Sequence, residues 1–204
     1  SHPIVARRII KAKEKGANLL ISHHPVIFDP LRRLEADSMP YRLAAEGLSA
    51  ICLHTNLDRA AGGVNDRLCR QIGLTDVTVA PDELCRIGLS PLSEPEQLAG
   101  LISDRLDTAV RLHTSGRSAR KVAVCGGAGG DYLIDLAKTD TTIDTVLTGE
   151  LKHHEWLQLN ALGLNVLEAG HYATEAPALW ALADWLTEAF GRLPWHIHTE
   201  KPYQ

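Results

Sequence analysis

Short, nearly continuous apolar runs alternate along this chain with longer segments in which apolar residues recur every three or four positions. The runs are typical of strands buried on both faces of a sheet, and the longer segments predict helices with one buried face. This alternation, which the second half repeats, indicates an α/β protein with largely parallel or mixed sheets. Expected strands are 17–22, 49–53, 76–80, 86–90, 121–125, 145–149, 165–169 and a last one near 195–199, and expected helices are 3–16, 38–47, 62–73, 95–107, 129–138, 152–162 and 175–190.

The most polar connection in the chain is DTAVRLHTSGRSAR at 107–120. A polar stretch between apolar segments is typical of a linker, so we expect two similar α/β lobes, the first over 1–112 and the second over 113–204. At 204 residues, one or two domains with a substantial core are expected. Residue 1 is Ser and the only methionine is Met39, so we expect the first lobe to lack an N-terminal segment.

Composition excludes several classes of protein. The chain is 45% hydrophobic with a formal net charge of −4, which argues against a disordered chain and against nucleic acid as a partner. No apolar run approaches the ~20 residues of a membrane-spanning helix, so we expect no membrane partner. The four cysteines lie far apart and form no C-x-x-C pair, so we expect free thiols and a cytoplasmic location.

Ten histidines are the unusual feature of this composition, because histidine is the commonest metal ligand. Several of them, together with acidic residues, directly follow expected strands. Ligands of open α/β sheets bind beyond the carboxyl ends of the strands, so the repeated placement predicts a site there. The groups are His23 with His24, His54 with Asp58, Glu150 with His153 and His154, and His171 with Glu175.

A metal site explains this pattern best. Adjacent side chains such as His23 and His24 normally diverge, so they can serve one cluster if each binds a different ion of a pair. His171 and Glu175 have the i, i+4 spacing that brings two side chains to one helix face. Asp58 and Glu175 supply negative charge, with Glu175 as a natural bridge. Imidazole and carboxylate ligands suit Zn, Fe, Mn, Co or Ni and do not distinguish among them.

The simpler alternative is that a histidine is a surface or hydrogen-bonded core residue. His153 and His154 point about 100° apart on a helix, so at most one of them faces a site. The remaining histidines have no partner motif, and we expect structural roles for them: His2, His113, His196 and His198.

The segment VAVCGGAGGDYL at 122–133 reads as a strand, a glycine-rich turn and a helix. Backbone N–H groups at Gly126, Gly127 and Gly129 could hold an anion at the helix N-terminus. The segment matches neither G-x-G-x-x-G nor a P-loop, so this signal is weak. The alternative, which the sequence favours, is a tight turn that needs small residues.

Five motifs in order resemble the NGG-interacting-factor-like family, whose bacterial members are called GTP cyclohydrolase type 2 homologues or dinuclear-metal-centre proteins. The resemblance covers roughly residues 4–200. It implies two α/β lobes with a dinuclear metal site between them and a toroidal homohexamer. The motifs are LLISHHPVIF, HTNLDRAAGGVNDRL, VAVCGGAGG, DTVLTGELKHHE and NVLEAGHYATE.

Transferred residue by residue, the resemblance implies two divalent metal ions per subunit. The chain departs from the family in lacking a Trp-Asp-Asn segment before the first helix, in reading TGE where TGD is commoner, and in leaving no room for an insertion between the lobes. The implied ligands are His23, His24, Asp58, His171 and Glu175, with His54, Glu150 and His154 around the same site.

We therefore expect a divalent-metal-dependent hydrolase that acts on a nucleotide or a phosphorylated small molecule, with Glu150 or His154 moving a proton. Nothing in these residues recognises guanine, so GTP as substrate comes from the family name alone. Two alternatives stay open. One is a non-catalytic metal-binding or regulatory scaffold that forms a ring, and the other is a dinuclear metallophosphoesterase.

Overall fold

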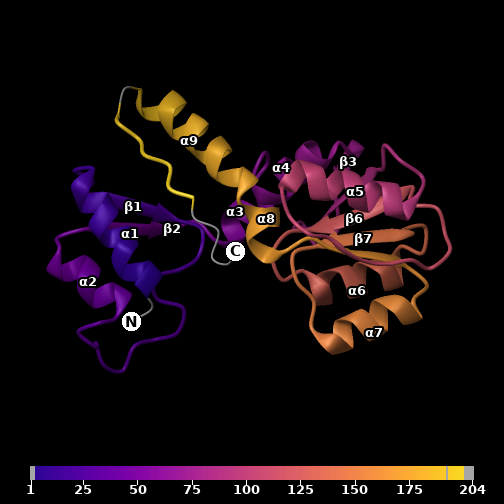
Figure 1. Ribbon diagram of the computed structural model, residues 1–204, viewed down its shortest axis with the longest axis horizontal. Helices are drawn as coiled ribbons and strands as arrows, with labels where there is room; N and C mark the ends of the chain where they lie inside the picture. Colours follow the sequence, from indigo (N-terminus) through magenta and orange to yellow (C-terminus); the bar gives the residue numbers. More distant parts are fainter. Residues whose placement is uncertain (1–2, 192, 200–204) are drawn as a thin grey trace. The chain divides into compact units, whose positions relative to one another are not determined.

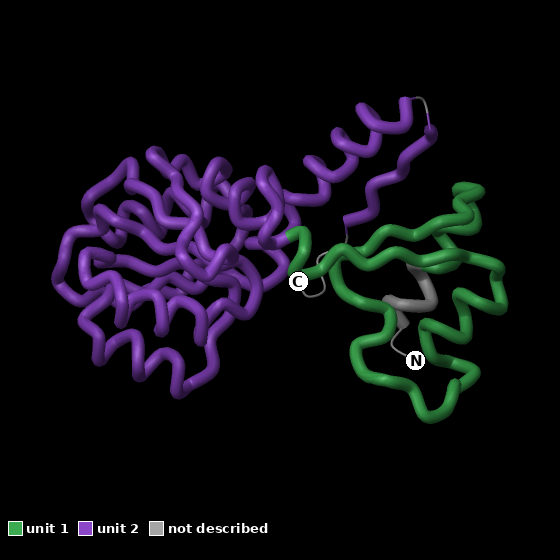
Figure 2. Tube along the Cα trace, turned by 180° about the vertical axis from the view of Figure 1, so that it is seen from behind, with its two compact units in different colours: residues 1–57, 202–204 green, residues 58–201 purple. Residues whose placement is uncertain are grey.

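The computed structural model describes residues 3–191 and 193–199, and the chain forms two compact units (Figures 1 and 2). Among the described residues, unit 1 ends at Leu57 and unit 2 begins at Asp58. This division lies well before the boundary expected near residue 112, because the polar stretch 107–120 belongs to the sheet of unit 2. None of the helices in the described ranges is long and apolar enough to cross a membrane.

Unit 1 contains a two-stranded parallel sheet with Ser22 opposite Cys52, so both strands end at the same level. Its small core consists of Ile9, Leu43 and Leu48. The carboxyl ends of the two strands therefore deliver the residues that follow them to neighbouring positions. The elements are α1 (Pro3–Glu14), β1 (Leu19–Ser22), α2 (Met39–Ala45) and β2 (Ser49–Cys52), followed by α3 (Thr55–Arg59), which spans the border of the units.

Unit 2 contains a six-stranded mixed sheet in the order β3-β4-β6-β7-β8-β5. The adjacent strands β6, β7 and β8 are parallel, whereas β3, β4 and β5 pair antiparallel with their neighbours. The expected α/β class with mixed sheets is thus confirmed. The strands are β3 (Thr75–Val79), β4 (Arg86–Leu89), β5 (Arg111–His113), β6 (Lys121–Cys125), β7 (Thr145–Thr148) and β8 (Asn165–Glu168).

Helices cover both faces of this sheet (Figure 1). One buried cluster joins α4 and α5 to one face through Leu68 and Ile102, and a second joins α6 and α7 to the other face through Leu133 and Leu159. Burial on both faces explains why the central strands read as continuous apolar runs. The helices are α4 (Val64–Ile72), α5 (Pro95–Leu106), α6 (Gly130–Thr139), α7 (His153–Ala161), α8 (His171–Glu175) and α9 (Pro177–Phe190).

Four elements differ from the expectation. The short helix α3 lies in the segment HTNLD, where no helix was expected. The short strand β5 lies inside the stretch taken for a linker, where Arg111 pairs with Glu168. The strand expected near residues 195–199 is wrong, because residues 193–199 form no regular structure. The helix expected over 175–190 is divided into α8 and α9, since Pro177 starts a new helix at its first turn.

The two units also differ in size and in sheet, rather than forming two similar lobes.

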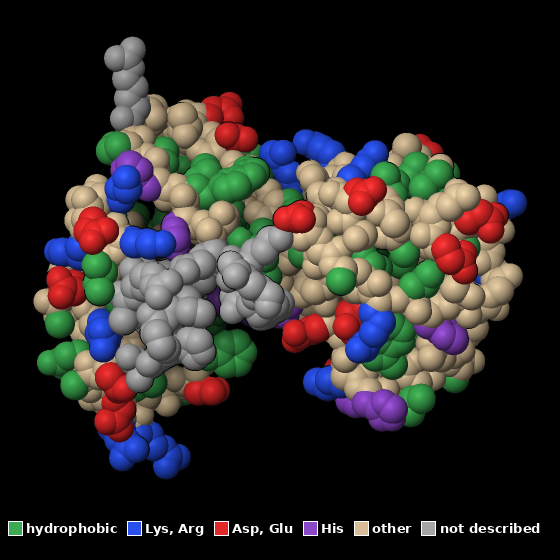
Figure 3. Space-filling view, viewed as in Figure 1, with side chains coloured by type: hydrophobic (Ala, Val, Ile, Leu, Met, Phe, Trp, Pro, Cys, Tyr) green, Lys and Arg blue, Asp and Glu red, His purple; other side chains and the backbone are tan. Residues whose placement is uncertain are grey.

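The charge pattern agrees with the composition. On the face drawn in Figure 3, the coloured Lys and Arg side chains are interspersed with Asp and Glu side chains. On that face, the described residues form no continuous basic stripe of the kind by which proteins track a phosphate backbone.

Candidate metal site

Three imidazoles meet at the carboxyl end of the unit 1 sheet. His23 and His24 follow β1, and His54 follows β2 by two residues. The ring centroids lie 5.1 Å apart for His23 and His24, 5.2 Å for His23 and His54, and 5.6 Å for His24 and His54. One ligand nitrogen from each ring lies within 4.8 Å of the others. The structure therefore joins His54 to the two histidines that the sequence singled out as ligands, and we call these three residues the imidazole group.

Hydrogen bonds to the backbone hold the turn that carries this group. The Ser22 hydroxyl donates to the His24 carbonyl over 2.8 Å, and the Cys52 thiol donates to the His23 carbonyl over 3.0 Å. His23 Nδ1 lies 2.8 Å from the Leu53 carbonyl oxygen. A carbonyl only accepts, so this contact assigns the proton to Nδ1 and the lone pair to Nε2. A backbone carbonyl that fixes the ring and its tautomer in this way is typical of metal-binding histidines.

In unit 2, His171 lies between two carboxylates. It is the first residue of α8, directly after β8 and Gly170. Its Nε2 is 2.9 Å from Glu175 Oε1, and its Nδ1 is 3.3 Å from Glu150 Oε1. The Glu175 carboxylate is largely buried, whereas the Glu150 side chain is 59% exposed. We call these three residues the carboxylate group.

The carboxylate group stabilises positive charge. The hydrogen bond to Glu175 raises the pKa of His171 from 6.5 to about 9, against the opposing effect of burial, and the charges of Glu175 and Glu150 add to the rise. The two carboxylates thus stabilise the positive charge of the imidazolium, and they would attract other cations in the same way. A divalent metal ion bound through His171 Nε2 and Glu175 would replace that proton, so the donor set fits such an ion.

Two glycines allow the carboxylate group to assemble at the ends of β6, β7 and β8. Gly127 has φ +65°, and a Cβ there would overlap the Glu175 carboxylate. A Cβ on Gly149 would lie 2.6 Å from Thr174 Oγ1 and 2.7 Å from the His171 Cα. The Gly127 carbonyl accepts from the N–H groups of Gly149 and Glu150, both over 2.9 Å, which ties the two turns together.

The N–H groups of Gly126, Gly127 and Gly129 in the glycine-rich turn already have acceptors within unit 2. Gly126 N donates to Asn65 Oδ1 over 2.7 Å. Gly127 N and Gly129 N donate to the hydroxyls of Thr174 and Thr148, each over 3.0 Å. An anion would have to displace these bonds. The geometry favours a tight turn, and anion binding there stays a prediction.

Asp58 lies at the start of unit 2, and its backbone is held by residues that the sequence did not single out. Asn65 Nδ2 donates to the Asp58 carbonyl over 3.4 Å, and Arg86 Nη2 donates to the Arg59 carbonyl over 3.0 Å. Arg86 is 1% exposed and pairs with Asp66, which also accepts from Gly62 N over 2.6 Å. A charged residue at the start of the apolar run RIGLS is the only sequence signal for this network.

His154, the second candidate for proton transfer, lies on α7. Its ring lies within 4.8 Å of carboxylate oxygens of Asp131 and Glu155. Glu155 already accepts from Lys152 N over 2.7 Å and lies 3.5 Å from the Lys152 ammonium. These residues lie in the first turns of α6 and α7, where the helix dipoles disfavour a cation. We therefore assign no metal to this cluster.

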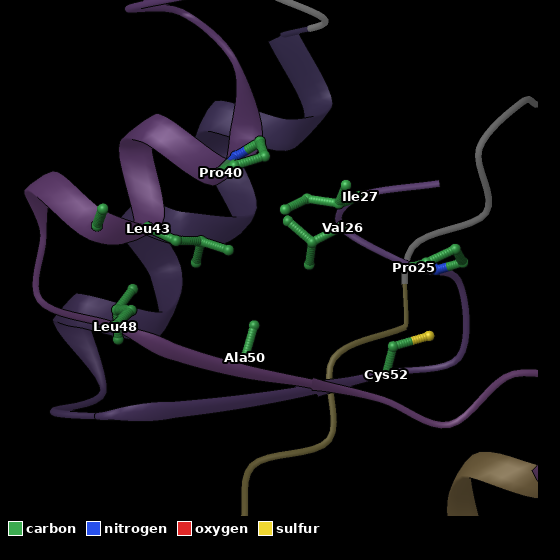
Figure 4. A pocket seen from close by; sticks show the side chains of 9 residues that line it. Pro25, Val26, Ile27, Pro40, Leu43, Leu48, Ala50 and Cys52 are labelled. Atoms are coloured by element: carbon green, nitrogen blue, oxygen red, sulfur yellow. The ribbon is translucent and has the colours of Figure 1, made fainter. Parts of the chain in front are cut away.

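Unit 1 also contains an apolar pocket of about 350 Å³ (Figure 4). Its lining comes from the loop after β1, from α2 and from β2, and includes Val26, Ile27, Leu43 and Leu48. The Cys52 thiol is the one polar side chain among the lining residues, and burial raises its pKa. The lining thus provides neither carboxylate nor imidazole ligands.

The fold and these two groups define an α/β protein with candidate metal ligands at the carboxyl ends of its strands. The model of the Duf34/NIF3 (NGG1p interacting factor 3) family matches residues 4–201, and the chain belongs to this family. The resemblance seen in the sequence motifs is thereby confirmed.

Relatives of known name and structure agree with this membership. The chain is 31% identical over 179 residues to the GTP cyclohydrolase 1 type 2 homolog of Lactococcus lactis, covering 82% of this chain and 69% of that protein. The Nostoc protein of the same name is 34% identical over 176 residues, covering 79% and 66%. The chain thus spans about two thirds of their length. The Thermus thermophilus protein TTHA1606 superposes with a TM-score of 0.81 at 29% identity, over 96% of this chain and 80% of that one.

Proposed function

We propose that this protein binds divalent metal ions through the imidazole group and through His171, Glu175 and Asp58, and uses them for hydrolysis. The convergence of His23, His24 and His54 carries the proposal, because three ligand nitrogens within 4.8 Å suit one metal ion. Nitrogen and carboxylate donors fit Zn, Fe, Mn, Co or Ni. The finer form of the proposal, taken from the family resemblance, is a dinuclear centre with two ions per subunit.

Each residue of the site has a separate role in this proposal. Bound divalent ions would supply Lewis acidity and lower the pKa of a water molecule toward neutrality. His23 is oriented by the Leu53 carbonyl and presents Nε2. Glu150 contacts His171 Nδ1 and fixes that ring, and its exposure lets it exchange protons with solvent. We therefore propose Glu150 as the proton-transfer residue and leave out His154, whose neighbours are Asp131 and Glu155.

The substrate class is proposed from the relatives. Their name, GTP cyclohydrolase 1 type 2 homolog, favours a nucleotide as the first compound to test. The engaged N–H groups of the glycine-rich turn favour a second candidate, a non-catalytic metal-binding protein, because they leave this turn without an evident phosphate cradle. Paired-metal sites also serve phosphoester hydrolysis, so phosphoesters belong in the same panel.

Turnover by metal-loaded protein separates these candidates. The protein is loaded with Mn, Fe or Zn and incubated with nucleotides and phosphoesters, beside Glu175→Gln and the exposed control Glu96→Gln on α5. We expect hydrolysis of at least one compound, loss in Glu175→Gln and full activity in the control. Activity unchanged in Glu175→Gln would refute the site. Full metal occupancy without turnover would favour the binding protein.

Assembly and location are proposals of the same kind. The family resemblance implies a homohexamer, and α9 exposes the large apolar side chains Trp180 and Phe190, which are suited to a subunit contact. Sedimentation equilibrium should give a mass of six chains, and a monomer at micromolar concentration would refute the ring. We likewise propose a cytoplasmic location, which imaging of a tagged chain tests.

A further inference from the structure

Asn65 on α4 uses both ends of its side-chain amide. Its Nδ2 donates to the Leu84 carbonyl over 3.0 Å and to the Asp58 carbonyl over 3.4 Å. Its Oδ1 accepts from Gly126 N over 2.7 Å. The residue is 1% exposed, so these contacts are formed away from solvent. One buried amide therefore connects three segments that are distant in sequence.

Two of these segments lead to proposed metal ligands. The first is the Asp58 segment itself. The second begins at Gly126, whose neighbour Gly127 packs against the Glu175 carboxylate and accepts from Glu150 N. A shift of the Gly126 backbone would therefore be transmitted through Gly127 to Glu175 and Glu150 of the carboxylate group.

We propose that Asn65 is a positioning residue that couples Asp58 to the carboxylate group, so that a single buried amide sets the spacing of metal ligands in unit 2. The inference rests on the proposed metal binding. Polar partners beyond the ligands of a metal site commonly change affinity about 10–100-fold when they are removed. Asn65 differs from such partners in touching the backbone on both sides of the ligand set instead of a ligand side chain.

The same unit provides a matched control. Asn165 is 0% exposed and also uses its whole amide, donating to the Arg117 carbonyl over 3.0 Å and to Thr145 Oγ1 over 3.1 Å, and accepting from Ser115 N over 2.9 Å. It is the first residue of β8, at the opposite end of that strand from His171. Loss of Asn165 therefore removes a similar buried network without touching either ligand segment.

The test compares Asn65→Ala with Asn165→Ala in the full chain. Thermal unfolding and Zn affinity, by competition with a chromophoric chelator, are measured for both and for the unsubstituted protein. We expect similar losses of thermal stability but an affinity loss of about tenfold or more for Asn65→Ala alone. Equal affinity in the two variants would overturn the inference.

Two further measurements keep the inference separate from the proposed function. Amide hydrogen exchange in metal-free protein should be faster at residues 126–127 and 149–150 in Asn65→Ala than in Asn165→Ala. If the unsubstituted protein takes up no metal, the proposed function fails, and equal exchange at these amides would overturn the positioning role independently.

Asn65→Asp separates the two contacts and is the milder substitution. It keeps an acceptor for Gly126 N but turns a carboxylate oxygen toward the carbonyls of Asp58 and Leu84. We expect Zn affinity between those of the unsubstituted protein and Asn65→Ala. Unchanged affinity and unchanged exchange in Asn65→Asp would overturn the coupling, because the Asp58 contact would then have no effect.

Discussion

The imidazole group of unit 1 and the carboxylate group of unit 2 are built in different ways. The imidazole group stands at the end of a two-stranded sheet whose strand β2 is mostly exposed, and backbone carbonyls hold its turn. The carboxylate group stands at the end of buried parallel strands, where close-approaching glycines bring a carboxylate against His171. One group offers imidazole nitrogens, and the other offers carboxylate oxygens.

This difference predicts a division of labour in metal binding. Imidazole nitrogens discriminate among divalent ions, whereas carboxylates attract cations of many kinds, protons included. We therefore expect the imidazole group to determine which metal binds and the carboxylate group to determine how binding depends on pH. The following experiments test this contrast.

Removing one ligand from either group should have the largest effect. We expect His23→Ala and His171→Ala each to lower the metal content from two ions to about one ion or fewer per chain, because each substitution removes a ligand. Elemental analysis after gel filtration measures this, with His113→Ala on β5 as a control. Retention of both ions in either variant would show that the ligand sets are wrong.

Arg86→Met should be the most damaging change to the support of unit 2. It removes a buried guanidinium from Asp66 and from the carbonyls of Arg59, Leu84 and Cys85, of which Leu84 and Cys85 keep a second donor in Asn65 Nδ2 and Ala80 N. We expect the free energy of unfolding in urea to fall by about 3–5 kcal/mol.

The exposed ion pair of unit 2 provides the control for that experiment. Arg111 pairs with Glu168 over 3.1 Å, but its side chain is 60% exposed. Arg111→Met should therefore cost about 1 kcal/mol or less. Equal losses in the two variants would mean that burial does not decide the contribution of Arg86.

The pH dependence of metal affinity should show the next largest difference between the two groups. Because a metal ion must displace the proton of His171, the affinity of the carboxylate group should rise about tenfold per pH unit up to the pKa of about 9. Chelator competition at pH 7, 8 and 9 measures this rise. Glu175→Gln should lower the pKa of His171 and shift the rise to lower pH, and an unchanged profile would contradict the assignment.

The same pKa has a defined effect on the stability of the metal-free protein. Folding raises the pKa of His171 from 6.5 to about 9, so the protonated ring stabilises the folded state fully below about pH 6.5. This contribution is lost as the pH rises through 9. Histidine resonances followed by NMR should show the titration near pH 9 without metal and its disappearance when metal is bound.

The smallest effect is expected at Cys52. Its thiol donates to the His23 carbonyl in a part-buried contact. Cys52→Ala should lower the free energy of unfolding by about 1 kcal/mol and weaken metal binding only a few-fold. A loss of metal as large as that of His23→Ala would show that the thiol itself is a ligand.

The sequence predicted most elements because buried parallel strands give continuous apolar runs and glycines end the helices. It missed β5 and α3, whose three and five residues are too few for a periodicity, and it placed a strand at residues 195–199, which form no regular structure. The imidazole group could be found because ligands follow strand ends. The Asn65 and Arg86 networks could not be found, since their partners lie up to 61 residues away along the chain.

Gly127 and Gly149 have a consequence for how this protein tolerates mutation. Neither residue contributes a side-chain atom, yet a single methyl group at either position would meet Glu175 or the backbone of His171. In a library of all single substitutions selected for metal retention, positions 127 and 149 should therefore be as intolerant as the ligand positions. The depletion of substitutions at these two glycines would report the shape of the site rather than its chemistry.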